Sequence, residues 1–539
     1  MTRIFKPTLY TLGISVLLFS CASAGGVLTT PIENIDTSPI KVSELTVSEK
    51  QSWAHLDLAK DTIPGMSVDK AYAEIIKNRK GKTTIVAVID SATDIDHEDL
   101  DGVIWKNKDE IPNNGKDDDN NGYIDDINGW NFVGDGYDEQ MEMTRIIASG
   151  DRSKPNFAAA ETAYNKEYQK YTELKTQYDQ IYQGVQSADK VLTKHFGKSD
   201  YTKKEVNAIT TQSEELGTAK NFAQFMFSNG FESMTEGITA VKKDLDNINM
   251  RLNVYLNKSL NGRKTGDDPN ILNDKPGYGN NNPRPTRPDE SHGTHVSGII
   301  AAERDNGKGI NGVANNVEIM AIRSTPNGDE YDKDVALAIR YAADNGAKII
   351  NMSFGKSFSP HSDWVRDAIV YAAQKDVLIV HGAGNDSENS DEFPSFPNDA
   401  VGTGQEIADN FINVGALEPK YGSGMVADYS NYGKLSIDVF APGSDIYSAV
   451  PGNKYESQGG TSMAAPNVAG VAALIRSQYP SLTAPQVKQI LMESGLPIKA
   501  KVVVGQNGAV KSLAEISTSG KIVNAYNALI MASKMANLK

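Results

Sequence analysis

The sequence predicts an α/β fold in which a mostly parallel sheet has helices on both faces and a large α-helical insertion interrupts the chain. The run 84–89 is apolar and β-branched without a break, which indicates a strand buried on both faces. From residue 317 onward, runs of this kind alternate with helical stretches, as in a parallel sheet covered by helices. Residues 156–258 contain no proline and have helical periodicity, which predicts the insertion.

The alternation assigns the individual elements in chain order. Apolar runs predict strands at residues 84–89, 317–322, 348–353, 377–380 and 411–414. Helical periodicity predicts helices at residues 334–343, 362–374 and 462–478, and a short helix of small and apolar residues begins at His292. The carboxyl ends of such strands form one edge of the sheet, where open α/β proteins build their sites.

Two stripes of side chains predict how the insertion packs. One has heptad spacing and consists of Met234, Ile238, Val241, Leu245, Ile248, Leu252 and Tyr255. The other is mainly aromatic and consists of Tyr164, Tyr168, Tyr171, Leu174, Tyr178 and Ile181. A self-contained antiparallel hairpin would bury these stripes against each other, and the alternative is a docking arm for a substrate or partner. The insertion spans residues 137–285, and the Gly-, Asn-, Asp- and Pro-rich stretch 262–290 predicts a flexible loop.

The N-terminus has the features of an export signal. Residues 1–24 begin with basic side chains and continue with an apolar run that is too short to remain as a spanning helix. Leu18-Phe19-Ser20-Cys21 resembles a bacterial lipobox, in which Cys21 is lipidated; the alternative is cleavage after Ala24 in an A-x-A pattern. We therefore expect a membrane-anchored lipoprotein, periplasmic or at the cell surface, or a secreted protein if the lipobox is not used. Residues 25–64 are polar and predict a tether and an N-terminal arm.

Composition argues against a nucleic-acid-binding protein and against a protein stabilised by disulfides. The 539 residues carry a net charge of −15 and no basic cluster, which argues against nucleic acid as a partner. Cys21 is the single cysteine, so the exported chain has no disulfide, and burial of its core or a bound metal must supply its stability.

Three motifs place an aspartate, a histidine and a serine at the ends of regular elements. Asp90 follows the first buried strand, and His292 lies in the first turn of a predicted helix, from which its ring can transfer protons. Ser462 lies in the segment 459–466, a glycine-rich loop that enters a helix and whose amides can donate to a developing oxyanion. Asp90 or Ser462 alone is more simply a cap of the following turn or helix. The three motifs together indicate acyl transfer.

These motifs resemble those of the subtilisin-like serine proteases, over roughly residues 65–135 and 286–535, and the order Asp, His, Ser is the one known for subtilisin. The segment 380–385 is similar to the family's oxyanion segment, with Asn385 as side-chain donor, and Ser353-Phe354-Gly355 is similar to its substrate-binding strand. The resemblance implies a subtilisin-like serine endopeptidase of the bacterial secreted lipoprotein type. Its substrates would be proteins or peptides, its triad Asp90, His292 and Ser462, and its catalytic domain residues 65–136 and 286–535.

One position departs from the family pattern. The family usually has Gly two residues after the catalytic Asp, where this chain has Ala92. A left-handed backbone there would cost Ala about 1 kcal/mol. The alternatives to an enzyme are a catalytically silent cell-surface scaffold and a calcium-binding adhesin, each using the helical insertion. The intact set of triad residues and Asn385 argues against the scaffold, and a fluorophosphonate label, which modifies only an active Ser462, would distinguish an enzyme from either alternative.

A run of acidic residues predicts a calcium site. Its start resembles an EF-hand-type loop, and the candidate ligands are Asp117, Asp119, Asn121, Tyr123 through its carbonyl, and Asp125. The twelfth position is Asn128 instead of Glu, so the pattern is incomplete, and a merely solvated acidic turn is the alternative. We expect Ca²⁺ as the cofactor and no organic cofactor.

Overall fold

The computed structural model describes residues 27, 29–33, 41–154, 156–402 and 404–538. Cys21 and the predicted signal segment lie outside the described residues. Among the helices that are described, none combines the length and the apolar character that crossing a membrane requires.

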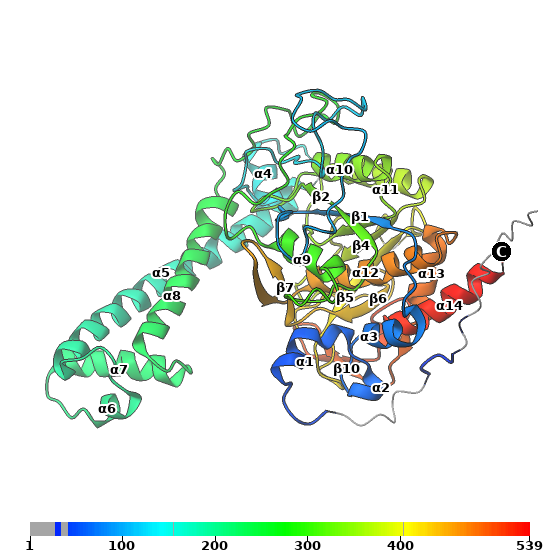
Figure 1. The fold of residues 1–539 in the computed structure, drawn as a ribbon. Helices are drawn as coiled ribbons and strands as arrows, with labels where there is room; N and C mark the ends of the chain where they lie inside the picture. Colours follow the sequence, from blue (N-terminus) through cyan, green and yellow to red (C-terminus); the bar gives the residue numbers. More distant parts are fainter. Residues whose placement is uncertain (1–26, 28, 34–40, 155, 403, 539) are drawn as a thin grey trace, which may run out of the picture.

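An eight-stranded sheet runs through the main body of the described chain, in the order β2-β1-β3-β4-β5-β6-β12-β9 (Figure 1). All of its neighbours pair in parallel except β12 and β9. The strands are β1 (Thr84–Asp90), β2 (Val317–Arg323), β3 (Ile349–Met352), β4 (Leu378–Gly382), β5 (Phe411–Leu417), β6 (Val439–Pro442), β9 (Leu496–Pro497) and β12 (Lys521–Ile522). Two hairpins lie outside it, β7 (Ile446–Val450) with β8 (Lys454–Gln458) and β10 (Val502–Val504) with β11 (Ala509–Lys511).

Helices cover both faces of the sheet, and β1 shows why its sequence is apolar throughout. Val86 and Val88 pack into the core under one face, while Ala87 and Ile89 pack into the core under the other. The first core is completed by α9 (His292–Ala301), α12 (Thr461–Gln478), α13 (Ala484–Glu493) and α14 (Ala525–Asn537). The second is completed by α10 (Asp332–Asp344) and α11 (Ser362–Gln374).

These elements confirm the predicted α/β fold, with a mostly parallel sheet, helices on both faces and a large helical insertion. The predicted helix 362–374 coincides with α11, and the predicted strand 84–89 ends one residue before β1 does. The sequence prediction missed β6, β9 and β12, which are only two to four residues long, and the helices α13 and α14. Strands this short offer too few residues for a periodic pattern.

Residues 47–66, predicted as part of a polar arm, pack against the main body. They form α1 (Val47–Ser52), the 3₁₀ turn η1 (Trp53–His55) and α2 (Leu58–Asp61), and α3 (Val68–Ala71) and the π-helical turn η2 (Tyr72–Ile76) follow. Trp53 is 1% exposed, and its Nε1 donates to the Ser444 carbonyl at 3.0 Å. A few apolar side chains, among them Ile63 and Met66, anchor a segment whose average composition is polar.

The insertion forms a long arm that extends away from the body (Figure 1). Its elements are α4 (Glu142–Ala148), α5 (Phe157–Phe196), α6 (Lys203–Ala208), α7 (Glu214–Ser228), α8 (Met234–Met250) and the π-helical turn η3 (Arg251–Tyr255). The 40 residues of α5 span about 60 Å at 1.5 Å per residue. Because α5 packs on both α7 and α8, the arm is a helical bundle and more than a hairpin. The heptad residues Met234, Val241, Leu245 and Ile248 are buried in it.

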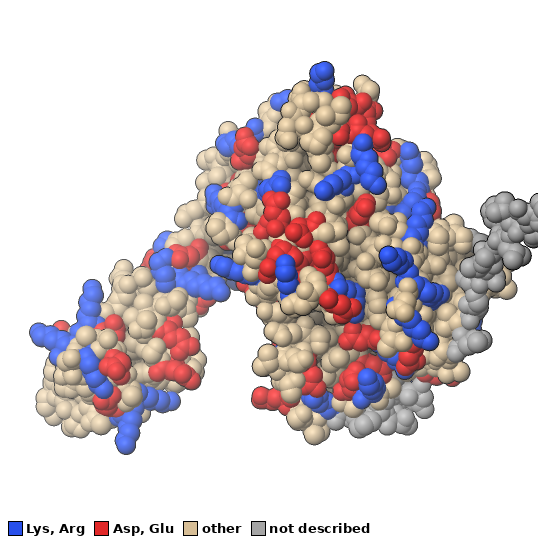
Figure 2. All heavy atoms as spheres, viewed as in Figure 1, with Lys and Arg blue, Asp and Glu red and all other residues tan. Residues whose placement is uncertain are grey.

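Charge is distributed unevenly between arm and body. Residues 157–255 carry 12 Lys and Arg against 13 Asp and Glu, so the arm is nearly neutral. Figure 2 shows both signs on the arm, whereas Asp and Glu gather over the middle of the body on the face in view. The net charge of −15 therefore belongs almost entirely to the body.

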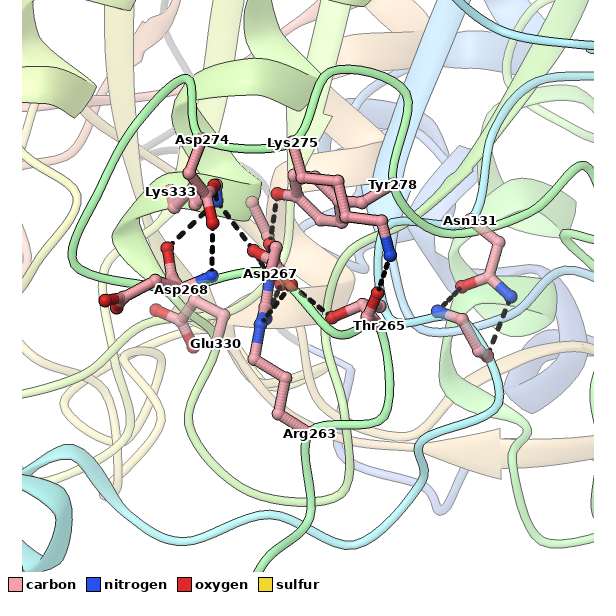
Figure 3. A network of polar contacts seen from close by, with 12 residues as sticks. Asn131, Arg263, Thr265, Asp267, Asp268, Asp274, Lys275, Tyr278, Glu330 and Lys333 are labelled. Carbon is pink, nitrogen blue, oxygen red and sulfur yellow. Dashed lines mark hydrogen bonds and ion pairs between the residues drawn. The ribbon is translucent and has the colours of Figure 1, made fainter.

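A buried ionic network holds the stretch 262–280, which the sequence predicts as flexible (Figure 3). Arg263 donates to Asp267 at 2.7 Å and to Asp334 of α10 at 2.9 Å. Lys333 of α10 lies 2.7 Å from the same Asp267, and both side chains are fully buried. Tyr278 donates to Asp334 at 2.5 Å. The network ties the returning end of the insertion to α10.

Candidate active site

Asp90 lies at the carboxyl end of β1, in the edge of the sheet where a site is expected. The side chain is 1% exposed. Its Oδ1 accepts a hydrogen bond from the Ser91 amide at 2.7 Å and lies 2.7 Å from His292 Nδ1. The structure thus brings together two of the three predicted triad residues, which are 202 positions apart in the chain.

His292 begins α9 and is 37% exposed towards the cleft described below. Burial lowers its pKa, but the charge of Asp90 and the hydrogen bond to it more than offset this, so the pKa of His292 stands above its ordinary value of 6.5. Gly293 permits this approach, because a Cβ there would lie 2.6 Å from the Ser91 carbonyl oxygen. Ala92 is fully buried and is not among the residues with a left-handed backbone, so the departure from glycine carries no strain of that kind.

Ser462 is the second residue of α12 and faces the same cleft. Its hydroxyl donates to the Ser353 carbonyl at 3.0 Å, and the Ser353 hydroxyl donates to the Ser462 carbonyl at 2.8 Å. The hydroxyl that is predicted to attack is therefore hydrogen-bonded to the predicted substrate-binding segment.

Asn385 lies at the end of the segment that follows β4, beside the start of α12. Its Oδ1 accepts from the Thr461 amide at 2.9 Å and from the Thr461 hydroxyl at 3.1 Å. Two donors on the oxygen fix the orientation of the amide and leave the Nδ2 hydrogens to point elsewhere. Asn385 and Ser462 line the same cleft.

A cleft of about 980 Å³ contains all of the predicted triad, oxyanion and substrate-binding residues. Its lining includes Asp90, His292, Ser462, Asn385 and the segment Ser353, Phe354 and Gly355. The insertion also contributes, through Tyr137, Met141 and Ala159. Sequence reasoning missed these three side chains, and the only signal for them was that the insertion connects two segments that meet at the cleft.

Two other histidines, His381 and His295, are buried and contact backbone carbonyl groups. His381 Nε2 lies 2.8 Å from the Phe354 carbonyl and its Nδ1 lies 3.1 Å from Asn413, and burial lowers its pKa. His295, which the sequence suggests is structural, is fully buried with Nε2 3.2 Å from the Glu456 carbonyl. Burial and the nearby His292 lower the pKa of His295 to about 3, so it stays neutral.

Three carboxylates, two of them from the acidic run, form a cluster that overlaps the predicted ligand set only in part. Ligand atoms of Glu110, Asp119 and Asp126 lie within 4.8 Å of one another. Burial raises the pKa of Asp126 to about 6, although hydrogen bonds from Tyr341, Asn121 and Asn107 lower it; the charge of Asp119 raises it further. Carboxylates this close repel one another in the absence of a cation.

The other predicted ligands make different contacts. Asp117 accepts from the amides of Asn121 and Gly122 at 3.0 and 2.9 Å, and Asp125 accepts from the amides of Asn114 and Gly115 at 3.1 and 2.9 Å. The Tyr123 ring packs against Trp130, Phe132 and Tyr341. Among the three carboxylates of the cluster, Asp119 is a predicted ligand, and the predicted ligand Asn121 donates to both Asp119 and Asp126 at 3.1 Å. Glu110 precedes the acidic run, and no spacing in the sequence links it to Asp126.

Comparison with known proteins agrees with this architecture. The sequence model described as the subtilase family matches residues 81–512, which is most of the chain. The chain belongs to the subtilase family.

Several curated relatives share part of the sequence. The chain is 43% identical over 189 residues to a thermophilic serine proteinase of Bacillus sp. (strain AK1), covering 35% of this chain and 43% of that protein. It is 39% identical over 220 residues to a cell wall-associated protease of Bacillus subtilis (strain 168), covering 40% and 22%. The chain thus spans less than half the length of either relative. Among solved structures, proteases from Pseudoalteromonas arctica are 29% identical at a TM-score of 0.39, covering 49% of this chain and 81% of that one.

Proposed function

We propose that the protein is a serine endopeptidase that hydrolyses proteins or peptides through an acyl-enzyme. The observation that carries this proposal is the 2.7 Å contact between Asp90 and His292 in a cleft that also contains Ser462 and Asn385. Membership of the subtilase family, and curated relatives with names such as thermophilic serine proteinase, support it. A scaffold or an adhesin would not require these four side chains in one cleft.

The proposed reaction begins when the Ser462 hydroxyl rotates from the Ser353 carbonyl towards His292. The Ser462 oxygen attacks the scissile carbonyl carbon, and His292 Nε2 takes up the hydroxyl proton. Asp90 holds the imidazole through Nδ1 and stabilises the imidazolium that forms. The C–N bond breaks as His292 returns the proton to the leaving amine. Water then attacks the acyl-enzyme by the same route and releases the acid and free Ser462.

The oxyanion of each tetrahedral intermediate would be held by Asn385 Nδ2 and the Ser462 amide. The oxygen of Asn385 is already occupied by Thr461, so its amide needs no reorganisation when negative charge develops. The segment Ser353–Gly355 would pair with the backbone of the substrate ahead of the scissile bond. We assign residues 65–136 and 286–535 to the catalytic domain, and residues 137–285 to the insertion.

A fluorophosphonate probe tests this function. The wild-type protein should be labelled at Ser462 and should hydrolyse peptides, and Ser462→Ala should lose both. Ser357→Ala is a matched control, because Ser357 is an exposed serine in the same cleft; this variant should still be labelled. A wild-type protein that is neither labelled nor active on any peptide would contradict the proposal, as would labelling that persists in Ser462→Ala.

We propose Ca²⁺ as the ion that fits the cluster of Glu110, Asp119 and Asp126. Calcium takes six to eight oxygen ligands, and three carboxylates supply hard oxygens of the required kind. Asn107 and Asn121 donate to Asp119 and Asp126 at 3.0–3.1 Å, and each also carries an amide oxygen. A bound ion would relieve the repulsion between the carboxylates and stabilise this loop.

The proposed location outside the cytoplasm follows from the signal segment. We propose residues 1–24 as a lipoprotein-type signal, Cys21 as the lipidated residue and the membrane as the partner of the anchor, with residues 25–64 as tether and arm. Metabolic labelling with a fatty-acid analogue should mark the wild-type protein and not Cys21→Ala. Equal labelling of both would contradict the lipid anchor without affecting the proposed peptidase.

A further inference from the structure

Carboxylates crowd the cleft outside the pair of Asp90 and His292. The lining includes Asp289, Glu290, Asp329, Glu330, Asp386, Glu388 and Glu392. Among the described residues that line the cleft, Lys356 is the single lysine and arginine is absent. The cleft also lies in the body of the protein, which carries almost all of the net negative charge.

Two cations in or beside the cleft wall, Arg323 and Lys356, are already bound by other groups. Arg323 is fully buried and donates to Glu290 at 2.6 Å, so the negative charge of Glu290 is neutralised inside the cleft wall. The Lys356 ammonium is 2% exposed and lies 2.8 Å from Glu142 and 2.9 Å from Asp332, neither of which faces the cleft. The remaining carboxylates of the lining therefore keep an excess of negative charge.

Glu330 provides an independent indication that a ligand with a donor group binds here. It is 2% exposed, it lies in the cleft wall, and its Oε1 has no hydrogen-bond partner within the described part of the chain. Figure 3 labels Glu330 and draws no dashed contact between it and the other residues shown. Burial raises the pKa of Glu330 to about 8, and the charge of Lys356 only partly opposes this. A buried oxygen without a donor is unfavourable, and a cationic group in the cleft would supply one.

A pair of carboxylates, Asp386 and Glu388, follows the oxyanion segment in the chain and also lines the cleft. Asp386 follows Asn385, and its Oδ2 lies 3.7 Å from the position that a methyl group on Gly384 would occupy. Burial and the charge of Asp386 raise the pKa of Glu388, while Lys166 of α5 lowers it. The two carboxylates repel each other close to the point where a substrate side chain would enter.

We propose that the cleft selects substrates with lysine or arginine side chains ahead of the scissile bond, with Asp386 and Glu388 binding one cation and Glu330 another. This inference rests on the proposed peptidase function. Both groups line the cleft that contains the segment Ser353–Gly355. Asp386 adjoins the oxyanion segment, and the backbone carbonyl of Glu330 accepts from Lys356, the residue after Gly355, at 2.8 Å. An ammonium or guanidinium would relieve the repulsion between Asp386 and Glu388, would supply a donor to Glu330 Oε1, and would form charge-assisted hydrogen bonds with each.

Paired peptides measure this preference directly. Each pair carries lysine or norleucine at one of the four positions before the cleaved bond, because norleucine keeps the alkyl chain and lacks the ammonium. The wild-type enzyme should show a kcat/KM for lysine at least tenfold above that for norleucine at one or more positions, which is about 1.4 kcal/mol. High salt should reduce the ratio at exposed positions, since it screens the attraction.

Variants identify the carboxylates responsible. The double variant Asp386→Asn with Glu388→Gln should lower the lysine-to-norleucine ratio at one position at least fivefold, and Glu330→Gln should do so at a different position. Asp367→Asn is the matched control, because it removes one exposed charge from α11, outside the cleft, and should keep the wild-type ratios. The ratio does not depend on the concentration of folded enzyme, so a partly misfolded variant still gives an interpretable value.

Wild-type ratios near one at all four positions would overturn this inference, and so would variants that behave like Asp367→Asn. Either result, with norleucine peptides still cleaved, would leave the proposed function intact. An absence of cleavage of every peptide, together with an absence of fluorophosphonate labelling, would instead overturn the proposed function and this inference with it.

Discussion

Replacing Lys356 by Met tests how the insertion is joined to the cleft. Lys356 follows Gly355, and its ammonium lies 2.8 Å from Glu142 Oε2, 2.9 Å from Asp332 Oδ1 and 2.8 Å from the Glu330 carbonyl oxygen. Glu142 begins α4 of the insertion, and Asp332 begins α10. One buried ammonium therefore connects the insertion, a helix of the body and the predicted substrate-binding segment.

The expected loss of stability follows from the pKa of Glu142. Burial raises this pKa, but the charges of Arg145 and Lys356 and their hydrogen bonds lower it more, from 4.5 to about 2. Each pKa unit corresponds to about 1.4 kcal/mol of free energy, so a fall from 4.5 to about 2 corresponds to roughly 3 kcal/mol of folding stability at neutral pH. Removing one partner of a buried ion pair costs about 3–5 kcal/mol. Because Arg145 still binds Glu142 at 2.5 Å, we expect Lys356→Met to lower the free energy of unfolding by about 3 kcal/mol.

The effect should depend on pH with a defined sign. The pKa of Glu142 is lower in the folded protein, so its contribution is fully present above about pH 4.5, the ordinary value, and is lost as the pH falls towards 2. The difference in stability between the wild type and Lys356→Met should therefore be largest near neutral pH and should narrow below about pH 4.

Urea unfolding followed by tryptophan fluorescence measures this difference, in a Ser462→Ala background to prevent self-cleavage. Lys375→Met is the matched control, because Lys375 pairs with Asp344 at 3.0 Å but both side chains are nearly half exposed. An exposed pair contributes about 0–1 kcal/mol. A Lys356→Met variant that loses no more stability than Lys375→Met would refute the reasoning. A double-mutant cycle with Glu142→Gln should give a coupling of at least about 1 kcal/mol.

The remaining predictions concern the active site, the arm and the calcium loop. Asn385→Ala should lower kcat by about 100- to 1,000-fold, the range known for this type of donor in subtilisin, and an unchanged kcat would remove Asn385 from the oxyanion site. In the proposed mechanism neutral His292 is the base, and its pKa is raised, so kcat/KM should fall towards acid pH through a pKa above 6.5. An Asp90→Asn variant, measured at its residual activity, should shift this acid limb of the pH profile to lower pH, and an unmoved acid limb would contradict the proposed role of His292. Replacing residues 172–246 by a short Gly/Ser linker should leave kcat/KM for small peptides within about tenfold of the wild type, or 1.4 kcal/mol, yet should alter the cleavage of folded proteins. An equal change for small peptides and for folded proteins would leave the arm a purely structural role. Calcium at 100 times its dissociation constant should stabilise the protein by about 2.7 kcal/mol, and Asp126→Asn should weaken this effect; equal stability with calcium and with a chelator would contradict the site.

The fold could be predicted from the sequence because the elements that determine it have strong local patterns. The run 84–89 is apolar at every position since β1 is buried on both faces, and the helix 362–374 has an apolar stripe that matches the face α11 buries. The segment 47–66 was predicted as an arm because its average composition is polar. Its packing depends on single side chains such as Trp53 and Ile63, which no periodic pattern reveals.

The two parts of the candidate site differ in how far sequence could predict them. Asp90, His292 and Ser462 each lie within a recognisable motif, and such motifs survive any length of chain inserted between them. The acidic cluster of Glu110, Asp119 and Asp126 depends on how one loop folds back on itself, and a spacing rule for a single loop could identify only Asp119. The charge of the cleft likewise comes from segments that are far apart in the sequence, so it becomes visible only in three dimensions.

The contacts among the proposed catalytic residues are separate from the contacts that the insertion makes with the cleft. The contact between Asp90 and His292 and the contacts of Asn385 with Thr461 are made within the body, with no side chain from residues 137–285. Within the described residues, the insertion lines the cleft at its base, through Tyr137, Met141 and Ala159, and there Glu142 binds Lys356. Changes in the insertion should therefore alter which substrates enter and how firmly the binding wall is held, while the distances that govern proton transfer stay fixed. On this argument, variants at the base of the arm should change KM more than kcat.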